Sequence, residues 1–397
     1  MQHHFCPTRF PPIPRGGAAD FDGKIVIVGA GVSGLFAALS LQRMGVRDFT
    51  VLEASDCIGG RLRATPDEFT SAVGGQAFDV GAEWIHSTDG DRVLASMMEG
   101  LTDDSDKVPT ELMPYQPTWH IRSRKSRLLT ALFRETKFKT STWHGWLKEH
   151  VYDKVKDKVE LKTPVEEIIY KLDGKVQVKL ANGETREADR VICTASLVVL
   201  KQSIEGKLLR FDPPLPEEKQ NAIRALDMPP GFRILFHMKE NFYNELTLSS
   251  SFCNLLSDPN DVALIYDAAL GKSHIDSNVL AFVAIGNKNA GQFSGQESTE
   301  LAAAALRRID ELFDGKGSAN LIGDPIVQDW TKDPYIRGSY SFPGPEKYRV
   351  TLGKPEGEGR ILFAGEHTSK KHFSLVPGAA YEGRRAALEA VASLGNM

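Results

Sequence analysis

The stretch from residue 29 to residue 34 has the composition and spacing of a turn that receives a dinucleotide phosphate. Gly29, Gly31 and Gly34 follow an apolar run at residues 24–28 and open a stretch with apolar residues on one face. Gly29 and Gly31 permit a tight turn, and a pyrophosphate could then rest near Val32 at the N-terminus of the next helix. Gly34 lets that helix pack on the strand. Such a motif also occurs in turns without a ligand, so its surroundings decide its meaning.

A carboxylate and a second phosphate-directed motif follow this turn. Glu53, with Ala54 next to it, ends an apolar run at residues 49–52, about 20 residues after the glycines, where ribose hydroxyls can donate to it. A basic residue there would suit a 2′-phosphate, so NADP is disfavoured. Gly60 permits another close approach, and Arg61 offers a fork of donors to phosphate oxygens. Two phosphate-directed motifs favour FAD over NAD.

The elements that must position these residues are those of a βαβ unit. The pattern predicts a strand at 24–28, a helix that ends at Gly45, and a strand at 49–52. Residues 87–159 are polar and basic, and we interpret them as a helical insertion. Alternating stretches predict a β-meander at 165–170, 175–180 and 190–194. Further strands are expected near 233–238, 279–285 and 360–364, and helices near 298–313 and 378–394.

Composition limits the class of protein. The 397 residues are 41% hydrophobic, enough for two structural domains, and the net charge of −4 favours neither nucleic acid nor an acidic membrane as partner. Four scattered cysteines predict no metal site, no redox dithiol and a reducing compartment. The first twenty residues lack the apolar stretch of a secretory signal and are expected to form a flexible leader. No membrane-spanning run of about 18 apolar residues is present. We therefore expect a cytoplasmic protein.

Several motifs follow one another along the chain. They are residues 25–35, Glu53, Gly59-Gly60-Arg61, the sequence Gly-Ala-Glu-Trp-Ile-His at 81–86 and Leu-Phe-Ala-Gly-Glu-His-Thr at 362–368. The order of these motifs resembles that of the flavin amine oxidases, with the polyamine oxidases as the nearest branch. The resemblance implies an α/β fold, with a discontinuous FAD-binding Rossmann-type domain and an α+β substrate-binding domain. Its expected boundaries are a leader at 1–20, an FAD-binding domain at 21–86, 151–203 and 331–397, and a substrate-binding domain at 87–150 and 204–330.

The resemblance also implies which residues surround the cofactor. The backbone of Val165 should contact adenine, and Glu366 the ribityl chain. Flavin-ring contacts are expected from Gly81, Ala82, Trp84 and the Val376 backbone, with Trp330 near the isoalloxazine. Monoamine oxidases of the family attach FAD to a cysteine in the segment after the Gly-Glu pair, whereas residues 367–378 contain none. FAD should therefore be bound noncovalently.

Three residues are candidates for chemistry on an amine. His86 occupies the position of a histidine in spermine-oxidising relatives and could bind or deprotonate the substrate nitrogen. Glu83 could place negative charge near a cationic amine, or serve as a loop carboxylate without catalytic consequence. Arg233 replaces the lysine that holds a water against flavin N5 in the family. Because a guanidinium does not give up its proton, we expect slower reoxidation by O2 than in typical relatives.

The departures from the family pattern leave the substrate open. Leu375, Pro377 and Ala380 stand where polyamine oxidases often carry aromatic or polar residues, and the insertion after Trp84 is short. The leading hypothesis is an oxidase of a polyamine or another primary or secondary amine. One alternative is an enzyme that dehydrogenates an amino acid, a cyclic amine or a specialised metabolite. Another is a low-turnover flavin-binding protein whose basic segment 122–127 docks a partner. The oligomeric state is not predicted.

Overall fold

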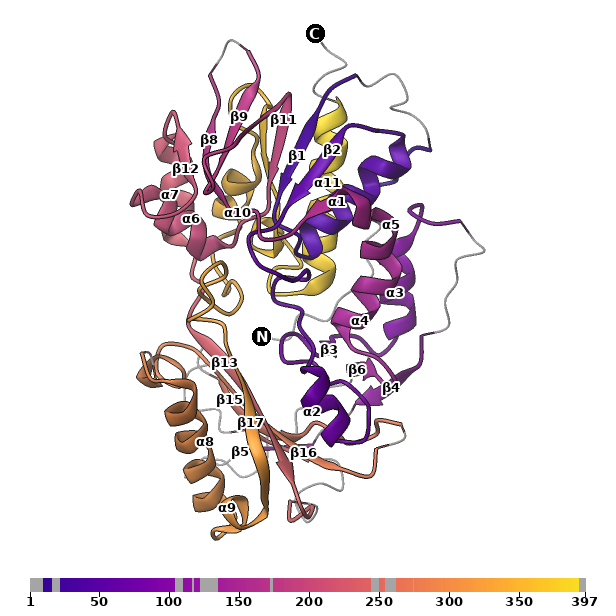
Figure 1. The fold of residues 1–397 in the computed structure, drawn as a ribbon, viewed down its shortest axis with the longest axis vertical. Coiled ribbons are helices and arrows are strands. Elements are labelled where there is room, and N and C mark those ends of the chain that lie inside the picture. Colours follow the sequence, from indigo (N-terminus) through magenta and orange to yellow (C-terminus); the bar gives the residue numbers. More distant parts are fainter. Residues whose placement is uncertain are drawn as a thin grey trace.

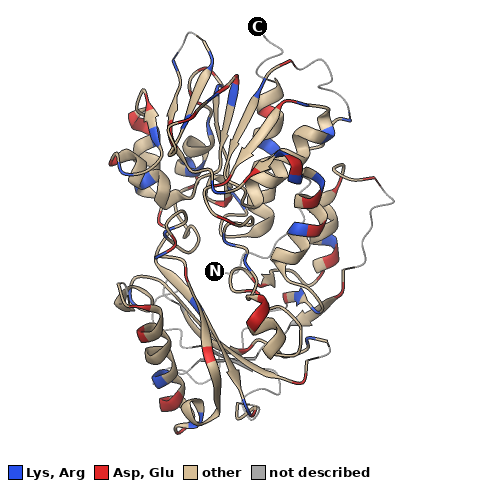
Figure 2. Ribbon diagram, in the orientation of Figure 1, with Lys and Arg blue, Asp and Glu red and all other residues tan. Residues whose placement is uncertain are grey.

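The computed structural model describes residues 10–15, 22–103, 110–115, 118–121, 135–171, 174–243, 250–253, 262–273, 275–293 and 295–392. Strands of a parallel sheet occupy the upper half of Figure 1, and those of a larger, mostly antiparallel sheet occupy the lower half. Charged residues of both signs lie along the outer helices (Figure 2). The basic segment 122–127, considered above as a docking element, lies outside the described residues.

The parallel sheet begins directly before the glycine turn and has the order β18-β11-β1-β2-β7. Every residue of β1 and β11 is buried, as expected of parallel strands covered on both faces. The predicted strand, helix and strand at the N-terminal end are confirmed, and Gly45 ends the helix in the left-handed conformation. The elements are β1 (Ile25–Val28), α1 (Val32–Met44), β2 (Phe49–Leu52), β7 (Val159–Glu160), β11 (Arg190–Cys193) and β18 (Ile361–Phe363).

Two long helices lie together on one face of this sheet (Figure 1). α11 (Val376–Ala392) packs along α1, and a Cβ atom added at Gly383 would lie 2.1 Å from the Ser33 carbonyl oxygen. This glycine therefore permits the close helix contact. α3 (Gly90–Met98) and α4 (Trp143–Leu147) complete the same core through buried apolar side chains such as Val93 and Trp143. Part of the 87–150 stretch thus packs on the helices that cover the parallel sheet.

The opposite face of the parallel sheet is covered by a small sheet of order β10-β9-β8-β12. The predicted meander is correct for its first two strands. Its third strand is at 185–188, however, because residues 190–193 are continuously buried and join the parallel sheet instead. The elements are β8 (Val165–Ile169), β9 (Val176–Leu180), β10 (Thr185–Ala188), α6 (Leu197–Ile204), β12 (Arg210–Asp212) and α7 (Glu217–Ala225).

The second large layer is a sheet of order β17-β13-β16-β15-β14-β5. One face packs on α8, and the other packs on the segment that contains α2 and leads to the cavity described below. The expected strands near 233–238 and 279–285 and the helix near 298–313 are confirmed. The elements are α2 (Asp67–Ala72), β5 (Thr118–Ile121), β13 (Gly231–Met238), β14 (Ser250–Cys253), β15 (Val262–Asp267), β16 (Asn278–Ile285), α8 (Ser298–Leu312), α9 (Lys316–Asn320), β17 (Leu321–Asp329) and α10 (Glu346–Gly353).

The insertion after residue 87 is only partly helical, which corrects the sequence-based interpretation. A three-stranded sheet of order β3-β6-β4 lies within and next to it. Its strands are β3 (Trp84–Ile85), β4 (Leu112–Tyr115) and β6 (Glu135–Phe138). The chain then continues through α4, a π-helical turn at Lys148–Tyr152 and α5 (Asp153–Val155). The pairing of β3 with β6 brings together several residues of the site described below, among them Trp84 and Lys137.

Residues 10–15, expected to belong to a flexible leader, instead lie against the core. Phe10 and Ile13 are buried, and the Arg384 guanidinium donates a hydrogen bond to the Pro11 carbonyl. Apolar side chains in an otherwise proline-rich stretch explain this attachment. No helix of the described part is long and apolar enough to cross a membrane.

Candidate active site

A cavity of about 1140 Å³ lies between the parallel sheet and the large sheet. All of the predicted site residues line it except Gly34. Residues from the glycine turn, from the end of β2 and from the start of β8 line one part. Residues from β3, β13, β15 and β16 line another. The cavity therefore joins the predicted dinucleotide site to the predicted site of chemistry.

The glycine turn has the open shape that a phosphate requires. A Cβ atom added at Gly31 would meet nothing within 4 Å, and one added at Gly60 would approach only the Gly31 Cα atom, at 3.4 Å. The first turn of α1 carries neither a side-chain cap nor an acidic residue, so its backbone N–H groups can receive an anion. Gly34 instead permits close packing of the helix on the turn, because an added Cβ would lie 1.9 Å from the Gly29 carbonyl oxygen.

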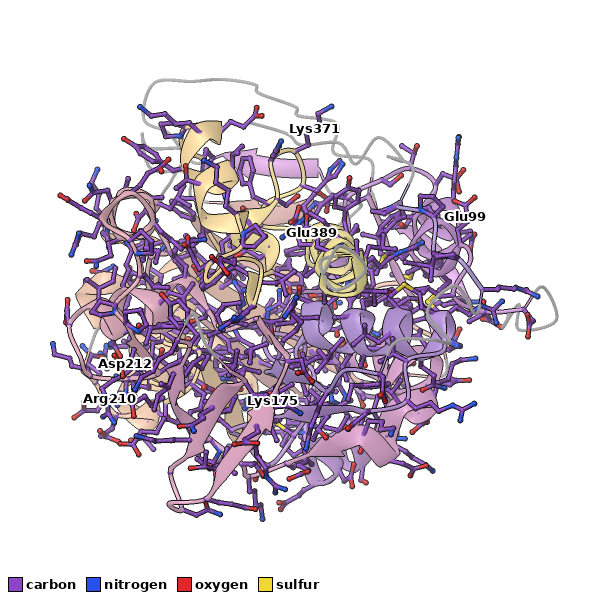
Figure 3. The ribbon with its side chains drawn as sticks, turned by 90° about the horizontal axis from the view of Figure 1, so that it is seen from above. Glu99, Lys175, Arg210, Asp212, Lys371 and Glu389 are labelled. Carbon is purple, nitrogen blue, oxygen red and sulfur yellow. The ribbon has the colours of Figure 1, made fainter. Side chains whose placement is uncertain are left out.

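Glu53 fastens the end of β2 to this turn. Its Oε2 accepts a hydrogen bond of 2.6 Å from the Ala30 amide, and its Oε1 accepts from the Ser55 amide and hydroxyl. A carboxylate has about four acceptor positions, so one remains for a ribose hydroxyl. Val165 lines the cavity beyond it. Arg210, exposed and labelled at the edge of the molecule in Figure 3, also lines this part, which brings the cavity toward the surface there.

Arg61, which is partly buried, and Glu366, which is buried, form an ion pair on the cavity wall. Arg61 Nη1 lies 2.8 Å from Glu366 Oε1 and also donates to the Ser339 carbonyl. Glu366 accepts three further hydrogen bonds, from the amide and hydroxyl of Ser341 and the Ser374 amide. Although burial opposes ionisation, the charges of Arg61 and His367 and the hydrogen bonds from Ser341 and Arg61 lower the pKa of Glu366 to about 2. A ribityl hydroxyl would have to displace one of these donors, because the four acceptor positions of Glu366 are already used.

The neighbouring wall fits a flat aromatic ring. A Cβ atom added at Gly81 would lie 1.8 Å from the Arg61 carbonyl oxygen and 3.3 Å from Trp330, so only glycine lets this segment pass. The Arg63 guanidinium lies over the Trp330 ring, 5.7 Å from its centroid. Val376 lines the cavity at the start of α11. Together with the open glycine turn, these features fit the two ends of a flavin dinucleotide.

Glu83, Lys137 and Arg233 form a buried charge network, which we call the charged triad. Glu83 Oε1 lies 2.8 Å from Lys137 Nζ, and Oε2 lies 3.0 Å from Arg233 Nη1. The Tyr266 hydroxyl donates a hydrogen bond to the same Oε2. Although burial opposes ionisation, the charges of Lys137 and Arg233 lower the pKa of Glu83. Both oxygens of Glu83 are thus engaged by protein groups, which favours a positioning role over attraction of a substrate cation.

Arg233 is held firmly in this network. The same Nη1 atom donates to the Asp79 carbonyl at 2.8 Å, and the guanidinium lies 5.5 Å from the centroid of the Trp84 ring. Burial raises the pKa of the Asp79 carboxyl to about 8 and lowers that of Lys272 to about 8, and the two groups act on each other. Asp79 and Lys272 are thus an acid and a base that interact with each other next to the triad.

His86 and Glu135 form a second polar pair on the cavity wall. His86 Nδ1 lies 2.8 Å from Glu135 Oε1, and the side chains are 39% and 11% exposed. The pairing of β3 with β6 places them together, because Trp84 lies opposite Lys137 and Ile85 opposite Thr136. Side chains alternate along a strand, so His86 and Glu135 share the face of Trp84 and Lys137. A carboxylate on Nδ1 leaves Nε2 as the proton acceptor of a neutral ring.

Apolar side chains provide most of the remaining wall near these two polar groups. They come from β13, β15, β16 and the segments around 340 and 375, and comprise Phe232, Leu264, Val283, Ile285, Tyr340, Phe373 and Leu375. Pro377 and Ala380 are buried without lining the cavity.

Sequence reasoning missed Glu135, Lys137 and Tyr266. Each reaches the site by pairing between segments far apart in the chain, and no motif marks it. An acid or a lysine on a short strand is ordinarily solvent-exposed. The one signal present in the sequence is Glu135 and Lys137 at the two-residue spacing of one strand face.

Comparison with known proteins places the chain in a family. The model of the family described as flavin containing amine oxidoreductase matches residues 32–138 and 144–391. Polyamine oxidase 7 of Oryza sativa subsp. japonica is 23% identical over 90% of this chain and 92% of its own length. Histone demethylase-like protein A of Aspergillus fumigatus is 30% identical, over 55% of this chain and 21% of its own length.

A solved structure has the same fold. Cyclohexylamine oxidase from Brevibacterium oxydans superposes with a TM-score of 0.72 at 17% identity, covering 94% of this chain and 100% of that one. The family match begins within the glycine turn, at residue 32, and includes all three residues of the charged triad. The chain therefore belongs to the flavin-containing amine oxidoreductases.

Proposed function

We propose that this chain is an FAD-dependent oxidase of primary or secondary amines. The observation that carries the proposal is one continuous cavity in which an open phosphate turn and an apolar wall with His86 and Glu135 meet. A bound flavin supplies the acceptor for hydride from the carbon beside nitrogen. The products are then an imine and, after transfer of the electrons to O2, hydrogen peroxide.

The His86–Glu135 pair is suited to hold the amine in its neutral form. Because Glu135 engages Nδ1, the Nε2 lone pair can take a proton from an incoming ammonium group. Loss of that proton frees the nitrogen lone pair, which assists departure of hydride from the neighbouring carbon. Trp84 and the apolar wall can surround the carbon skeleton and limit access of water.

The polarity of the wall favours an amine with one nitrogen on an apolar skeleton. Glu83 is bound by Lys137 and Arg233, and Glu135 by His86, so neither carboxylate on this wall is free of a partner. A long polyamine needs several acidic contacts along its length. Polyamine oxidation remains the second candidate, because Glu135 keeps acceptor positions that a second ammonium could use.

We further propose that FAD is bound noncovalently. The described residues that line the cavity include no cysteine. Denaturing the yellow protein with acid should therefore release FAD into the supernatant. Flavin that stays with the precipitate would contradict this assignment.

A cytoplasmic location also stays a proposal, and so does O2 as the electron acceptor.

Anaerobic mixing tests the function directly. The purified yellow protein is mixed with cyclic and linear monoamines, spermine, spermidine and acetylated polyamines, and flavin absorbance is followed before air is admitted. Bleaching by monoamines with recovery in air is the expected result. Bleaching by polyamines alone would select the second candidate, and bleaching without recovery would indicate an acceptor other than O2. No bleaching by any amine would contradict the proposal and favour an amino acid, a specialised metabolite or a low-turnover binding role.

A further inference from the structure

The charged triad continues away from the cavity as a row of alternating charges. Arg233 and Glu83 line the cavity, whereas Lys137 is not among the described residues that do. Lys137 is 1% exposed, and besides Glu83 it donates to the Ala268 carbonyl at 3.0 Å. Its charge also acts on Asp267, which is 5% exposed. In the order of their interactions the groups are Asp267, Lys137, Glu83 and Arg233, of which the last two line the cavity.

The order of these groups determines the sign of the charge at the wall. Glu83 alone would neutralise Arg233, its partner at 3.0 Å. Lys137 offsets Glu83 from the other side. Burial raises the pKa of Asp267 and so weakens the charge that would offset Lys137 in turn, which leaves the positive charge of the guanidinium at the wall. Side chains this deeply buried are poorly screened by solvent, and the effect of a charge at such a site reaches across several ångströms.

We propose that Lys137 is a positioning residue that acts through Glu83 on Arg233 and thereby raises the reduction potential of the bound flavin. The inference rests on the proposed function. Reduction adds negative charge to a flavin, and a positive wall stabilises that state relative to the oxidised one. Lys137 exerts this effect without contact with the cavity. Lys137 also holds the Glu83 carboxylate, which in turn accepts a hydrogen bond from Arg233 Nη1.

The charges predict an order of reduction potentials for a set of nearly isosteric variants. Lys137→Met leaves Glu83 to neutralise Arg233 and should have the lowest potential. The double variant Glu83→Gln/Lys137→Met removes a matched pair of charges and should lie near the wild type. Glu83→Gln alone leaves two uncompensated cations and should lie highest. A merely structural role for Lys137 would not produce this order, because every substitution would then disturb the same packing.

The test measures the midpoint potential of the flavin in each holoenzyme against redox dyes. We expect Lys137→Met to fall by at least about 30 mV, which corresponds to a tenfold change in the equilibrium constant of a two-electron couple. Lys137→Arg, which keeps the charge, should stay near the wild type. A double variant with a potential no higher than that of Lys137→Met would overturn the proposal, as would an unchanged potential in folded Lys137→Met.

Two further outcomes are distinguishable. If Lys137→Met does not fold, the midpoint potentials of Glu83→Gln, the double variant and the wild type test the inference instead. A potential of Glu83→Gln at or below that of the wild type would then overturn it. If the wild-type protein binds no flavin, the proposed function itself fails. A yellow wild-type protein that bleaches with amines, combined with potentials that do not follow the predicted order, refutes only the inference.

Discussion

The ion pair between Arg61 and Glu366 should contribute strongly to the stability of the fold. Glu366 is 4% exposed, and its carboxylate has four hydrogen-bond donors from three separate segments. We therefore predict that Glu366→Gln, which keeps the size of the side chain and removes its charge, lowers the free energy of unfolding. The variant also cannot satisfy all four donors, because an amide offers one oxygen.

The pKa of Glu366 gives the magnitude. At about 1.4 kcal/mol for each tenfold change, lowering this pKa from 4.5 to about 2 corresponds to about 3 kcal/mol of stabilisation at pH 7. Because the pKa in the folded state lies below that in the unfolded state, the stabilisation is present above about pH 4.5 and is lost as the pH falls toward 2. At pH 3.5 about 2 kcal/mol should remain.

Urea unfolding of the flavin-free protein, followed by tryptophan fluorescence, measures this difference without a contribution from flavin affinity. The matched control is Glu389→Gln on α11, labelled in Figure 3, whose side chain is 39% exposed beside Arg385. It should change the free energy of unfolding by less than about 1 kcal/mol. The reasoning would be refuted if Glu366→Gln fell within the range of this control at pH 7, or if the difference did not shrink between pH 4.5 and 3.5.

Three further substitutions test the site. Gly34→Ala should greatly reduce the yield of soluble, flavin-bound protein, because the added Cβ would lie 1.9 Å from the Gly29 carbonyl oxygen. Gly31→Ala should stay folded and lose flavin affinity, because its Cβ would meet nothing within 4 Å. Equal behaviour of the two variants in flavin titrations would contradict both assignments. His86→Ala should lower kcat/KM for amines by roughly 100-fold, the effect of losing a general base, and a smaller effect at high pH would identify proton transfer as its role. Arg233→Lys should reoxidise about tenfold faster, equivalent to roughly 1.4 kcal/mol in the barrier, when reduced enzyme is mixed with O2.

The end of the cavity at the glycine turn could be predicted because its signals are local. The turn, the strand before it and the helix after it occupy consecutive residues, and the requirement for glycine comes from the backbone itself. Glu53 was found in the same way, since it ends the next strand and accepts from Ala30 in the turn. Such features depend on spacing, which a single sequence contains.

The chemical end could be predicted only in part because its contacts are distant in sequence. His86 and Glu135 are 49 residues apart, and Glu83 and Tyr266 are 183 apart. These contacts depend on the register of β3 against β6 and on the position of β15 in the large sheet. The same limit explains the misplaced meander strand at 190–193, whose partner in the parallel sheet is β1, far away along the chain.

The charged triad changes what the arginine at position 233 means. Taken alone, Arg233 is a cation at a position where the resemblance to the family implies a lysine. In the structure it shares Glu83 with Lys137, and the guanidinium reaches both Glu83 and the Asp79 carbonyl. A lysine introduced at 233 would lie near the ammonium group of Lys137, and this like charge should lower its pKa and help it to exchange a proton. The faster reoxidation expected of Arg233→Lys should therefore be smaller in a Lys137→Met background. An equal gain in both backgrounds would mean that Lys137 does not act on this position.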